Sequence, residues 1–434
     1  MKIILLTPGT GSYHCGVCMR DNAMARELIA QGHDAVLLPM YLPLTLDEAP
    51  ANPGAPIFYG GISVYLQQKF AWFRTAPRWV DAFLNHPALL RWVGKYSGMT
   101  SGADLGALTH SMLLGDDGRQ NRELEHLVDW LVAQGRPDAI WLSTGLLVGL
   151  ARRLRAALRV PVICSLQGED SFLDGLAEPW RTRCWELLRA RAGDVQRFIA
   201  PSRYYGDLMG ARLGLDSSQW RVIYNGINLD GLAPVAPLAE PAVIGYLARM
   251  TEGKGLGLVV DAFILLKLRG RFPMAVLRCA GAMTSADEGY VRRLQLKLNA
   301  AGCSGDVEFL SNVTREGKAE FLRSLSLLSV PATYGEAFGL YLIEALAAGV
   351  PLVQPQCAAF PEIVEATGGG LLYDADDAEG LVKMWELLLG DPVLARDLGR
   401  RGRAVVEKDF SVTAMARRFL AETREIIDAE NAAA

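Results

Sequence analysis

An alternation of strand-like and helix-like segments, which runs along the chain twice, constrains the fold more than any other feature of this sequence. In the first half, short apolar segments of strand length are separated by helical patterns of apolar residues, and after residue 241 the same alternation starts again. The expected strands are 2–7, 34–40, 138–143, 160–166, 197–202 and 220–226, followed by 242–248, 275–281, 307–310, 327–332, 351–355 and 370–374. Alternating strands and helices predict a parallel sheet that is covered by helices on both faces.

Between the two runs lies a segment, residues 228–241, that is rich in Pro, Ala and Leu and has no clear period. We interpret it as an interdomain linker. The 434 residues are enough for two or three domains with cores of their own, and the two runs favour two. We therefore expect an α/β protein with two doubly wound Rossmann-like domains, residues 1–235 and 236–408. They should face a central cleft at the carboxyl ends of their strands.

Charge and apolar runs exclude several classes of protein. The formal net charge is −4, so no global positive field attracts nucleic acid, and we expect no nucleic-acid partner. No apolar run reaches the roughly 20 residues that cross a bilayer, and the start of the chain lacks the apolar region of a secretory signal. We expect a cytoplasmic protein. The seven cysteines are an odd number, which favours reduced thiols over a disulfide framework.

The glycine-rich loop after the first expected strand, residues 9–25, allows three interpretations. A dinucleotide fingerprint requires G-x-G-x-x-G, but a histidine occupies the third glycine position and no acidic residue ends the next strand to hold a ribose. Cys15 and Cys18 have the spacing of a redox or metal-binding pair at a helix start, but small residues packed in a tight loop explain them more simply. The third interpretation is a loop, with Gly11 and Gly16, whose backbone a ligand can approach closely.

The expected second domain contains two glutamates in the motif "YGEAFGLYLIEALAAGVP". Glu336 precedes an expected helix that Phe338, Gly339 and Leu340 open, and Glu344 lies about a turn and a half inside it. Unpaired amides at a helix start suit a phosphate or a sugar hydroxyl, and a carboxylate can accept hydrogen bonds from paired ribose hydroxyls. Either glutamate alone is better explained as a helix-start or surface residue, so the combination carries the prediction.

Two cations extend this pattern. The sequence "GYLARMTEGKGL" places Arg249 and Lys254 on a glycine-containing loop after the first strand of the second domain. Two positive charges beside a ligand site suit a diphosphate leaving group, whereas elsewhere they would be ordinary surface charges.

Taken together, these motifs resemble the retaining, family 4 type of glycosyltransferase, which has the two-domain GT-B fold. The resemblance rests on Arg249 and Lys254, on "YNGI" with Asn225, on "GEAFGLYLIEALAAGVP" and on "PEIVEATGGGLLYD", and it covers nearly the whole chain. It implies that Arg249 and Lys254 bind the donor diphosphate and that Asn225 belongs to the donor site.

The same resemblance implies roles for the helix-start motif and for the end of the chain. Glu344 would bind the ribose, and Glu336 would bind the sugar and phosphates together with the amides of Phe338, Gly339 and Leu340. The last helix, within residues 409–434, would cross back onto the N-terminal domain.

Two departures from the family pattern affect the acceptor side. Where the family commonly has a histidine at the end of a first-domain strand, this chain has Gln167 in "CSLQGED", and an amide is a poor proton acceptor. The double glycine usual in the first loop is replaced by cysteine and Gly16. We place Gly11, Gly16, Gln167 and Asp170 on the acceptor side.

The resemblance implies sugar transfer that leaves the anomeric configuration unchanged, with the departing phosphate taking the acceptor's proton. Arg249 and Lys254 would stabilise the charge that develops on the diphosphate. The stretch "DADD", residues 374–377, looks like a metal-binding D-x-D, but a turn and a helix N-cap explain it more simply. We expect no metal and no cofactor, because the nucleoside diphosphate sugar is a co-substrate.

One segment, residues 69–96, does not fit the alternation and is aromatic and basic. It opens an insertion that we place at residues 69–115. Such a composition suits a membrane surface that would present a lipid-linked acceptor. The plainer alternative is an acceptor lid whose aromatic rings stack on sugars or form local core.

Our leading hypothesis is a retaining glycosyltransferase that moves a sugar from a UDP-, GDP- or ADP-sugar to a carbohydrate or lipid-linked acceptor. A nucleotide-sugar epimerase on the same fold is the first alternative. A non-catalytic protein that binds nucleotide sugars or membranes is the second. The expected location is the cytoplasm, with peripheral contact at the inner membrane face if residues 69–96 bind lipid.

Overall fold

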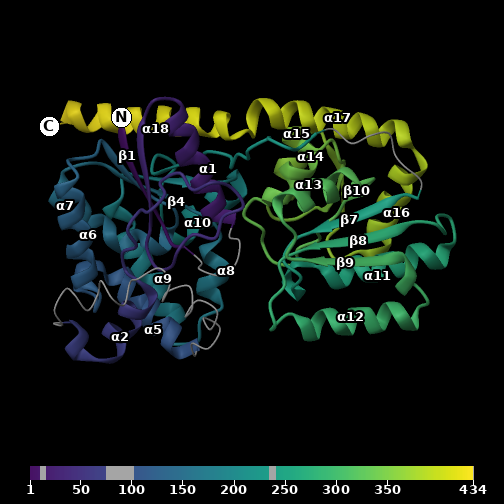
Figure 1. The fold of residues 1–434 in the computed structure, drawn as a ribbon, viewed down its shortest axis with the longest axis horizontal. Helices are drawn as coiled ribbons and strands as arrows, with labels where there is room; N and C mark the ends of the chain where they lie inside the picture. The colour runs from purple at the N-terminus through teal and green to yellow at the C-terminus, as the bar shows by residue number, and fades with distance from the viewer. Residues whose placement is uncertain (10–15, 75–101, 234–240, 434) are drawn as a thin grey trace. The chain divides into compact units, whose positions relative to one another are not determined.

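The computed structural model describes residues 1–9, 16–74, 102–233 and 241–433. The chain divides into two compact units: unit 1 is Met1–Tyr224 with Met415–Ala434, and unit 2 is Asn225–Ala414. Each unit contains a six-stranded sheet in which every strand pair is parallel, with helices around it (Figure 1). The prediction of an α/β fold with two Rossmann-like domains is confirmed.

The sheet of unit 1 has the strand order β2-β1-β3-β4-β5-β6. Its strands are β1 (Lys2–Thr7), β2 (Asp34–Pro39), β3 (Ala139–Leu142), β4 (Val162–Ser165), β5 (Arg197–Ala200) and β6 (Trp220–Val222). All residues of β3 and β4 are buried, which is why these strands are continuous apolar runs rather than alternating ones. The order of the strands reverses between β1 and β3, so a ligand of this unit is expected beyond the carboxyl ends of these two strands.

Helices surround this sheet and include several that the sequence pattern did not predict. In the described residues the α-helices are α1 (Gly16–Ala30), α2 (Gly61–Lys69), α5 (Gly102–Leu114), α6 (Asn121–Ala133), α7 (Ala151–Leu158), α8 (Glu169–Asp174), α9 (Trp180–Arg191), α10 (Arg203–Leu213) and α18 (Val412–Ala433). The 3-10 helices include η1 (Ala71–Arg74), η3 (Gly115–Asp117), η4 (Gly145–Leu150) and η5 (Ala192–Asp194).

The apolar pattern of residues 146–158, "LLVGLARRLRAAL", predicts one α-helix, but only its second half is α-helical, because its first half is η4. Gly149 explains the difference: its Cα lies so close to the backbone of α5 that an added Cβ would be 2.3 Å from the carbonyl oxygen of Met112. Thr144 caps the 3-10 turn by accepting a hydrogen bond from the Leu146 amide. Close packing of Gly149 against α5 therefore replaces the regular α-helix at this point.

The last helix, α18, completes the core of unit 1. The ring of Phe419 stacks on Trp141 of β3 with centroids 3.6 Å apart, and the Trp141 indole donates to the Thr423 hydroxyl at 3.1 Å. Arg197 of β5 pairs with Glu422 at 2.7 Å. The end of the chain is thus held by stacking, a buried hydrogen bond and an ion pair.

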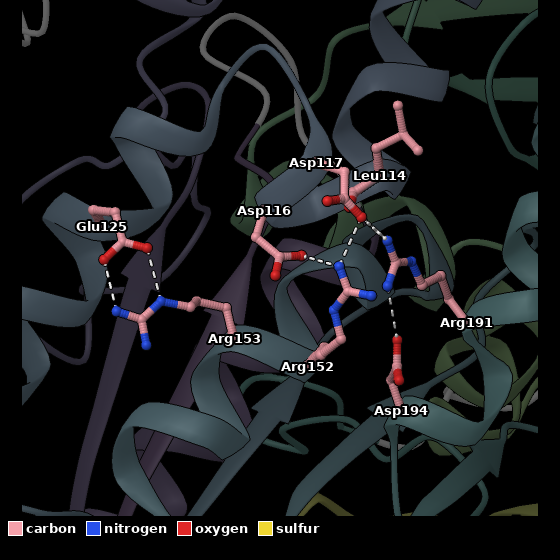
Figure 2. A network of polar contacts seen from close by, with 8 residues as sticks. All are labelled: Leu114, Asp116, Asp117, Glu125, Arg152, Arg153, Arg191 and Asp194. Carbon is pink, nitrogen blue, oxygen red and sulfur yellow. Dashed lines mark hydrogen bonds and ion pairs between the residues drawn. The ribbon is translucent and has the colours of Figure 1, made fainter.

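A network of charged side chains joins the outer helices of unit 1 (Figure 2). Arg152 of α7 pairs with Asp116 at 2.5 Å and with Asp117 at 2.7 Å. Arg191 of α9 also reaches Asp117, at 3.2 Å, and donates to the Leu114 carbonyl at 2.7 Å. Arg152 and Asp117 are solvent-exposed, so their ion pair contributes little to stability, whereas Arg191 is buried and holds α9 to the end of α5.

The sheet of unit 2 has the strand order β12-β11-β10-β7-β8-β9, which reverses between β7 and β10. Its strands are β7 (Val243–Leu247), β8 (Val276–Gly281), β9 (Val307–Ser311), β10 (Leu327–Leu328), β11 (Leu352–Pro355) and β12 (Gly370–Tyr373). Each coincides with a strand expected from the sequence. The loops after β7 and β10 therefore flank the position where open α/β sheets bind ligands.

The helices of unit 2 lie on both faces of its sheet (Figure 1). They are η6 (Glu252–Lys254), α11 (Leu256–Arg269), α12 (Glu288–Ala300), η7 (Ser304–Asp306), α13 (Arg315–Arg323), α14 (Leu340–Ala347), α15 (Phe360–Thr367), α16 (Ala378–Gly390) and α17 (Pro392–Asp409). Trp385 of α16 is fully buried, and its indole donates to the hydroxyl of Ser329 just after β10 at 2.8 Å. This bond anchors the outer helix layer next to the strand that leads into the candidate site.

Most of the aromatic and basic segment 69–96 falls in residues 75–101, outside the described residues. Of its described part, Phe70 and Trp72 are largely exposed. None of the helices in the described part of the chain is both long enough and apolar enough to cross a bilayer.

Candidate functional site

The loops after β7 and β10 bring two predicted catalytic residues together. Lys254 lies in η6 after β7 and Glu336 lies in the loop after β10, and Lys254 Nζ donates to Glu336 Oε2 at 2.5 Å. The loops are also tied through their backbones, since the Thr333 amide donates to the Gly253 carbonyl at 2.9 Å. Gly255 allows this close packing, because its φ is +73° and a Cβ would lie 1.7 Å from the Pro331 oxygen.

Lys254 is held in a cage of negative charge and aromatic rings. Its ammonium lies 4.8 Å from the centroid of the Tyr334 ring and 5.6 Å from that of the Tyr341 ring, within cation–π range. Burial alone would lower the pKa of Lys254, but the attraction of Glu336 and Tyr334 together outweighs it and raises the pKa above its ordinary value. Lys254 is therefore a permanent cation at neutral pH.

Glu336 is fixed on one side of its carboxylate. Its Oε2 accepts hydrogen bonds from Lys254 and from the Tyr341 hydroxyl, the latter at 3.0 Å. Its backbone carbonyl accepts a hydrogen bond from the Ala359 amide at 3.2 Å. Among the described residues, Oε1 of Glu336 takes no hydrogen bond, so one carboxylate oxygen remains available to a ligand.

Arg249, the third predicted catalytic residue, follows β7 directly and has a half-exposed side chain. Its guanidinium contacts Asp287 at 3.3 Å, and its carbonyl accepts a hydrogen bond from the buried Tyr246 hydroxyl at 3.0 Å. Burial alone would raise the pKa of Asp287, but hydrogen bonds from Thr284 and the charge of Arg249 hold it below its ordinary value. Arg249 is thus tethered at the carboxyl end of β7 with a charged counter-ion.

Glu344, the predicted ribose-binding residue, lies inside α14. Lys318 of α13 pairs with it at 2.8 Å, and both side chains are mostly buried. Lys318 is not predictable from the sequence as a partner, because no local spacing links it to Glu344. Its positive charge offsets a carboxylate in the C-terminal half of a short helix, where the helix dipole disfavours negative charge.

The start of α14 has the backbone geometry of a ligand-binding turn. Gly339 precedes the helix with φ +85°, a conformation that other residues adopt only with strain, and Leu340 is the first helical residue. The amides of the first turn of a helix have no intrahelical acceptors.

Phe338 is buried, and its ring lies 6.3 Å from that of Phe410. Asn225, also predicted in the donor site, is a buried residue at the start of unit 2.

The predicted acceptor-side residues of unit 1 are only partly described. Gly16 is the first residue of α1, while Gly11 and Cys15 lie outside the described residues. Gln167 and Asp170 follow β4, at the carboxyl edge of the sheet. The structure therefore places three of the four residues after β1 or β4.

A buried glutamate that the sequence analysis did not single out organises this edge. Glu169 is 2% exposed, and its two carboxylate oxygens accept hydrogen bonds from the loops after β3 and β4. The Tyr205 hydroxyl lies 3.0 Å from Glu169 and 2.8 Å from Asp170. The other donors to Glu169 are the Thr144 hydroxyl and the amides of Gly145, Gln167 and Gly168. Glu169 thereby fixes the backbone of the loop that carries Gln167.

Two motifs from the sequence have structural explanations. Asp376 adopts a left-handed turn with φ +59°, and Asp377 is the N-cap residue of α16, as predicted, although no described residue of that helix donates a hydrogen bond to its side chain. Cys18 is fully buried in the first turn of α1, where the Thr7 hydroxyl approaches its sulfur at 3.9 Å. Cys18 is therefore packed as a small buried residue.

A cavity of about 550 Å³ in unit 1 lies apart from these residues. Its lining includes Arg155, Arg159 and Val160, which precede β4, and Asp194, which precedes β5. It therefore sits at the amino edge of the sheet, opposite to the edge where such sheets bind ligands. None of the predicted site residues that the structure describes lines it.

Two models of known protein families match most of the chain. The family model described as Glycosyl transferases group 1 matches residues 234–405, and the model described as Glycosyltransferase Family 4 matches residues 112–230. The first match covers the whole candidate site of unit 2 except Asn225, which falls in the second match.

Curated relatives are sugar-transferring enzymes by name. The phosphatidyl-myo-inositol mannosyltransferase of Mycobacterium leprae is 29% identical over 250 residues, which are 56% of this chain and 60% of that protein. Its counterpart from Mycolicibacterium smegmatis matches over 50% of its length, so the chain spans only about half to three fifths of these relatives. The lipopolysaccharide core biosynthesis mannosyltransferase LpsB of Rhizobium meliloti is 31% identical over 316 residues, 69% of this chain and 82% of that protein.

Solved structures with low sequence identity share the fold. The sucrose-phosphate synthase of Thermosynechococcus elongatus aligns with a TM-score of 0.73 at 20% identity, over 99% of this chain and 100% of that one. Anabaena Alr3699/HepE, solved in complex with UDP-glucose, aligns with a TM-score of 0.65 at 17% identity, over 98% and 99% of the two chains. With the sequence matches and the two parallel sheets, these findings show that the chain belongs to the glycosyl transferases of group 1, the family 4 type.

Proposed function

We propose that this chain is a retaining glycosyltransferase that moves a sugar from a nucleoside diphosphate sugar to a carbohydrate or lipid-linked acceptor. The observation that carries the proposal is the Lys254–Glu336 pair, which stands at the point where the strand order of unit 2 reverses. Lys254 and Arg249 supply two cations there, and the start of α14 supplies backbone amides. This combination suits a diphosphate.

In the proposed reaction, the acceptor hydroxyl oxygen forms a bond to the anomeric carbon while the bond between that carbon and the diphosphate oxygen breaks. The acceptor's proton passes to the departing phosphate oxygen, and the new bond forms on the face that the leaving group vacates. Lys254 and Arg249 stabilise the growing negative charge of the diphosphate. Glu336 binds the sugar through its available oxygen, and Glu344 accepts hydrogen bonds from the ribose hydroxyls.

Related proteins support the donor class more than the acceptor. Anabaena Alr3699/HepE has been solved with UDP and with UDP-glucose, and the first curated relatives are named as mannosyltransferases acting on phosphatidyl-myo-inositol. A nucleoside diphosphate sugar donor and a hydroxyl-bearing acceptor follow by analogy. Gly11, Gly16, Gln167 and Asp170 remain our proposed acceptor-side residues.

A thermal-shift screen tests the donor class first. The full chain is heated with UDP-, GDP- and ADP-sugars, and a ligand that binds the folded state raises the midpoint. The sugar that gives the largest shift is then used in a turnover assay with carbohydrate and lipid-linked acceptors. The proposal predicts a glycosylated acceptor and a free nucleoside diphosphate in equal amounts.

Two variants assign the reaction to this site. Lys254→Ala and Glu336→Gln should each abolish most of the turnover, and survival of full turnover in both would place the reaction elsewhere. An isomerised nucleotide sugar formed without acceptor would instead identify an epimerase. Binding without turnover by the unaltered chain, over the whole acceptor panel, would identify a non-catalytic binding protein.

Peripheral membrane contact through residues 69–96 is part of the proposal for a lipid-linked acceptor. Phe70 and Trp72, at the described start of this segment, expose aromatic surface of the kind that enters a bilayer interface. Flotation of the protein with anionic liposomes measures this contact. Equal flotation of the full chain and of a variant in which the aromatic residues of 69–96 are replaced by serine would contradict it.

A further inference from the structure

We propose that Tyr341 is a positioning residue that holds the Glu336 carboxylate in place through its hydroxyl. The inference rests on the proposed function, because it concerns the part of that reaction in which Glu336 binds the sugar. Tyr341 is the second residue of α14, and its hydroxyl donates to Glu336 Oε2 at 3.0 Å. The helix that carries the ligand-binding turn thus also carries the group that orients Glu336.

Lys254 and Tyr341, which both donate hydrogen bonds to Glu336 Oε2, should respond differently when a diphosphate binds. Lys254 is the cation proposed to bind the donor diphosphate, so part of its interaction shifts from Glu336 to the phosphate oxygens when the donor binds. Tyr341 carries no charge and has no such competing partner. Its hydroxyl therefore remains to fix Oε2, and this leaves Oε1 directed to the sugar.

The hydroxyl of Tyr341 stays a hydrogen-bond donor over the working range of pH. Burial, followed by the negative charge of Glu336, raises the pKa of Tyr341 well above its ordinary value. A protonated phenol beside a carboxylate forms a charge-assisted hydrogen bond, which is stronger than a neutral one. The bond is therefore maintained at neutral pH.

The ring of Tyr341 has a separate contact that a single substitution can preserve. Its centroid lies 5.6 Å from the Lys254 ammonium, so the ring contributes to the cation–π cage. Tyr341→Phe keeps this ring and removes only the hydroxyl. The effect of the variant therefore reports the hydrogen bond to Glu336 and not the packing of α14.

The chain offers a matched control in Tyr373. This tyrosine is buried, and its hydroxyl has no hydrogen-bond partner in the described part of the chain. Tyr373→Phe therefore removes the same atom from unit 2 without breaking a bond. Its turnover and ligand affinity should equal those of the unaltered chain.

The test measures two affinities and one rate on the full chain. UDP, GDP and ADP, and UDP-glucose, GDP-mannose and ADP-glucose, are titrated calorimetrically, and release of nucleoside diphosphate from the best donor gives kcat. For Tyr341→Phe we expect affinity for the nucleoside diphosphate within about twofold of the unaltered chain. Two quantities should each fall about tenfold: kcat, and the extra affinity that the sugar part of the donor confers. This is the effect of losing one charge-assisted hydrogen bond.

The possible failures are distinguishable. If the unaltered chain binds none of the six compounds, the proposed function fails. If it binds and turns over a donor but Tyr341→Phe has the same kcat and the same sugar-dependent affinity, the positioning role is overturned while the proposed function stands. If Tyr341→Phe weakens the binding of the nucleoside diphosphate and of the nucleoside diphosphate sugar by the same factor, the residue acts on the fold of α14. The positioning role is then also overturned.

Discussion

Lys254 Nζ lies 2.5 Å from Glu336 Oε2, and this contact joins the loops that follow the two central strands of unit 2, β7 and β10. The two residues are 82 positions apart in the chain, so only the topology of the sheet brings them together. Because both side chains are mostly buried, neither charge is well hydrated without the other. The pair therefore has a structural role and is also a candidate for a role in catalysis.

A double-mutant cycle on this pair should show strong coupling. Glu336→Gln leaves Lys254 buried without its counter-ion and should lower the free energy of unfolding of unit 2 by about 1–3 kcal/mol. Lys254→Met alone should cost a similar amount, and the double variant should cost less than the sum. Urea unfolding of the four proteins measures the coupling, and strict additivity would show that the two charges do not stabilise each other.

Gly339→Ala should damage the start of α14. Its φ of +85° disfavours any Cβ, and the added atom would lie 3.1 Å from Leu342 Cδ1. We expect a loss of about 1–2 kcal/mol in the free energy of unfolding, together with weaker nucleotide binding. The control is Gly289→Ala in α12, where a Cβ meets nothing within 4 Å. It should be neutral or slightly stabilising, and equal losses in the two variants would refute the strain argument.

Asp287 makes the stability of unit 2 depend on pH. The pKa of this carboxyl is lower in the folded protein than its ordinary value, which in the unfolded chain is about 3.9. Its stabilising contribution is therefore fully present above the unfolded pKa and is lost as the pH falls through the folded pKa. The free energies of unfolding of Asp287→Asn and of the unaltered chain should differ by a steady amount above about pH 4, and the difference should shrink as the pH falls further, through the folded pKa. A difference that does not shrink below about pH 4 would contradict the assignment.

Glu169→Gln should destabilise unit 1. The glutamine has one acceptor oxygen and one NH₂ group where the glutamate accepts hydrogen bonds at both oxygens, so at least one buried donor loses its partner. We expect a loss of about 2–4 kcal/mol in the free energy of unfolding. Glu125→Gln on α6, at a half-exposed ion pair with Arg153, serves as the control and should cost less than about 1 kcal/mol.

Phe419→Ala should loosen the core of unit 1. Phe419 is buried and stacks on Trp141, so its removal leaves a cavity that costs about 3–5 kcal/mol. Hydrogen exchange followed by mass spectrometry should show faster exchange in β3 and α18. The control is Val132→Ala, which shortens an exposed side chain of α6. Unchanged protection of β3 would mean that α18 does not contribute to this core.

The strands and the helix-start motif were predictable because their signals are local. Buried parallel strands are continuous apolar runs, and Gly339 directly precedes a helix that the pattern of apolar residues predicts. Lys318, Tyr341 and Glu169 were not predicted as partners, since each acts on a residue that only the fold or a helix turn brings near. The 3-10 geometry of η4 was missed for the same reason: Gly149 meets the backbone of α5, which lies far away in the sequence.

The position of α18 has a consequence for biosynthesis. Ribosomes make the chain in the N- to C-terminal direction, so β1 to β6 emerge early, whereas Phe419 and Thr423, which cover Trp141, emerge only after unit 2. The earlier-made half must therefore wait, with Trp141 uncovered, until all of Asn225–Ala414 has been translated. A message truncated before α18 would yield a nascent product that exposes this apolar surface and becomes a substrate for chaperones and proteases.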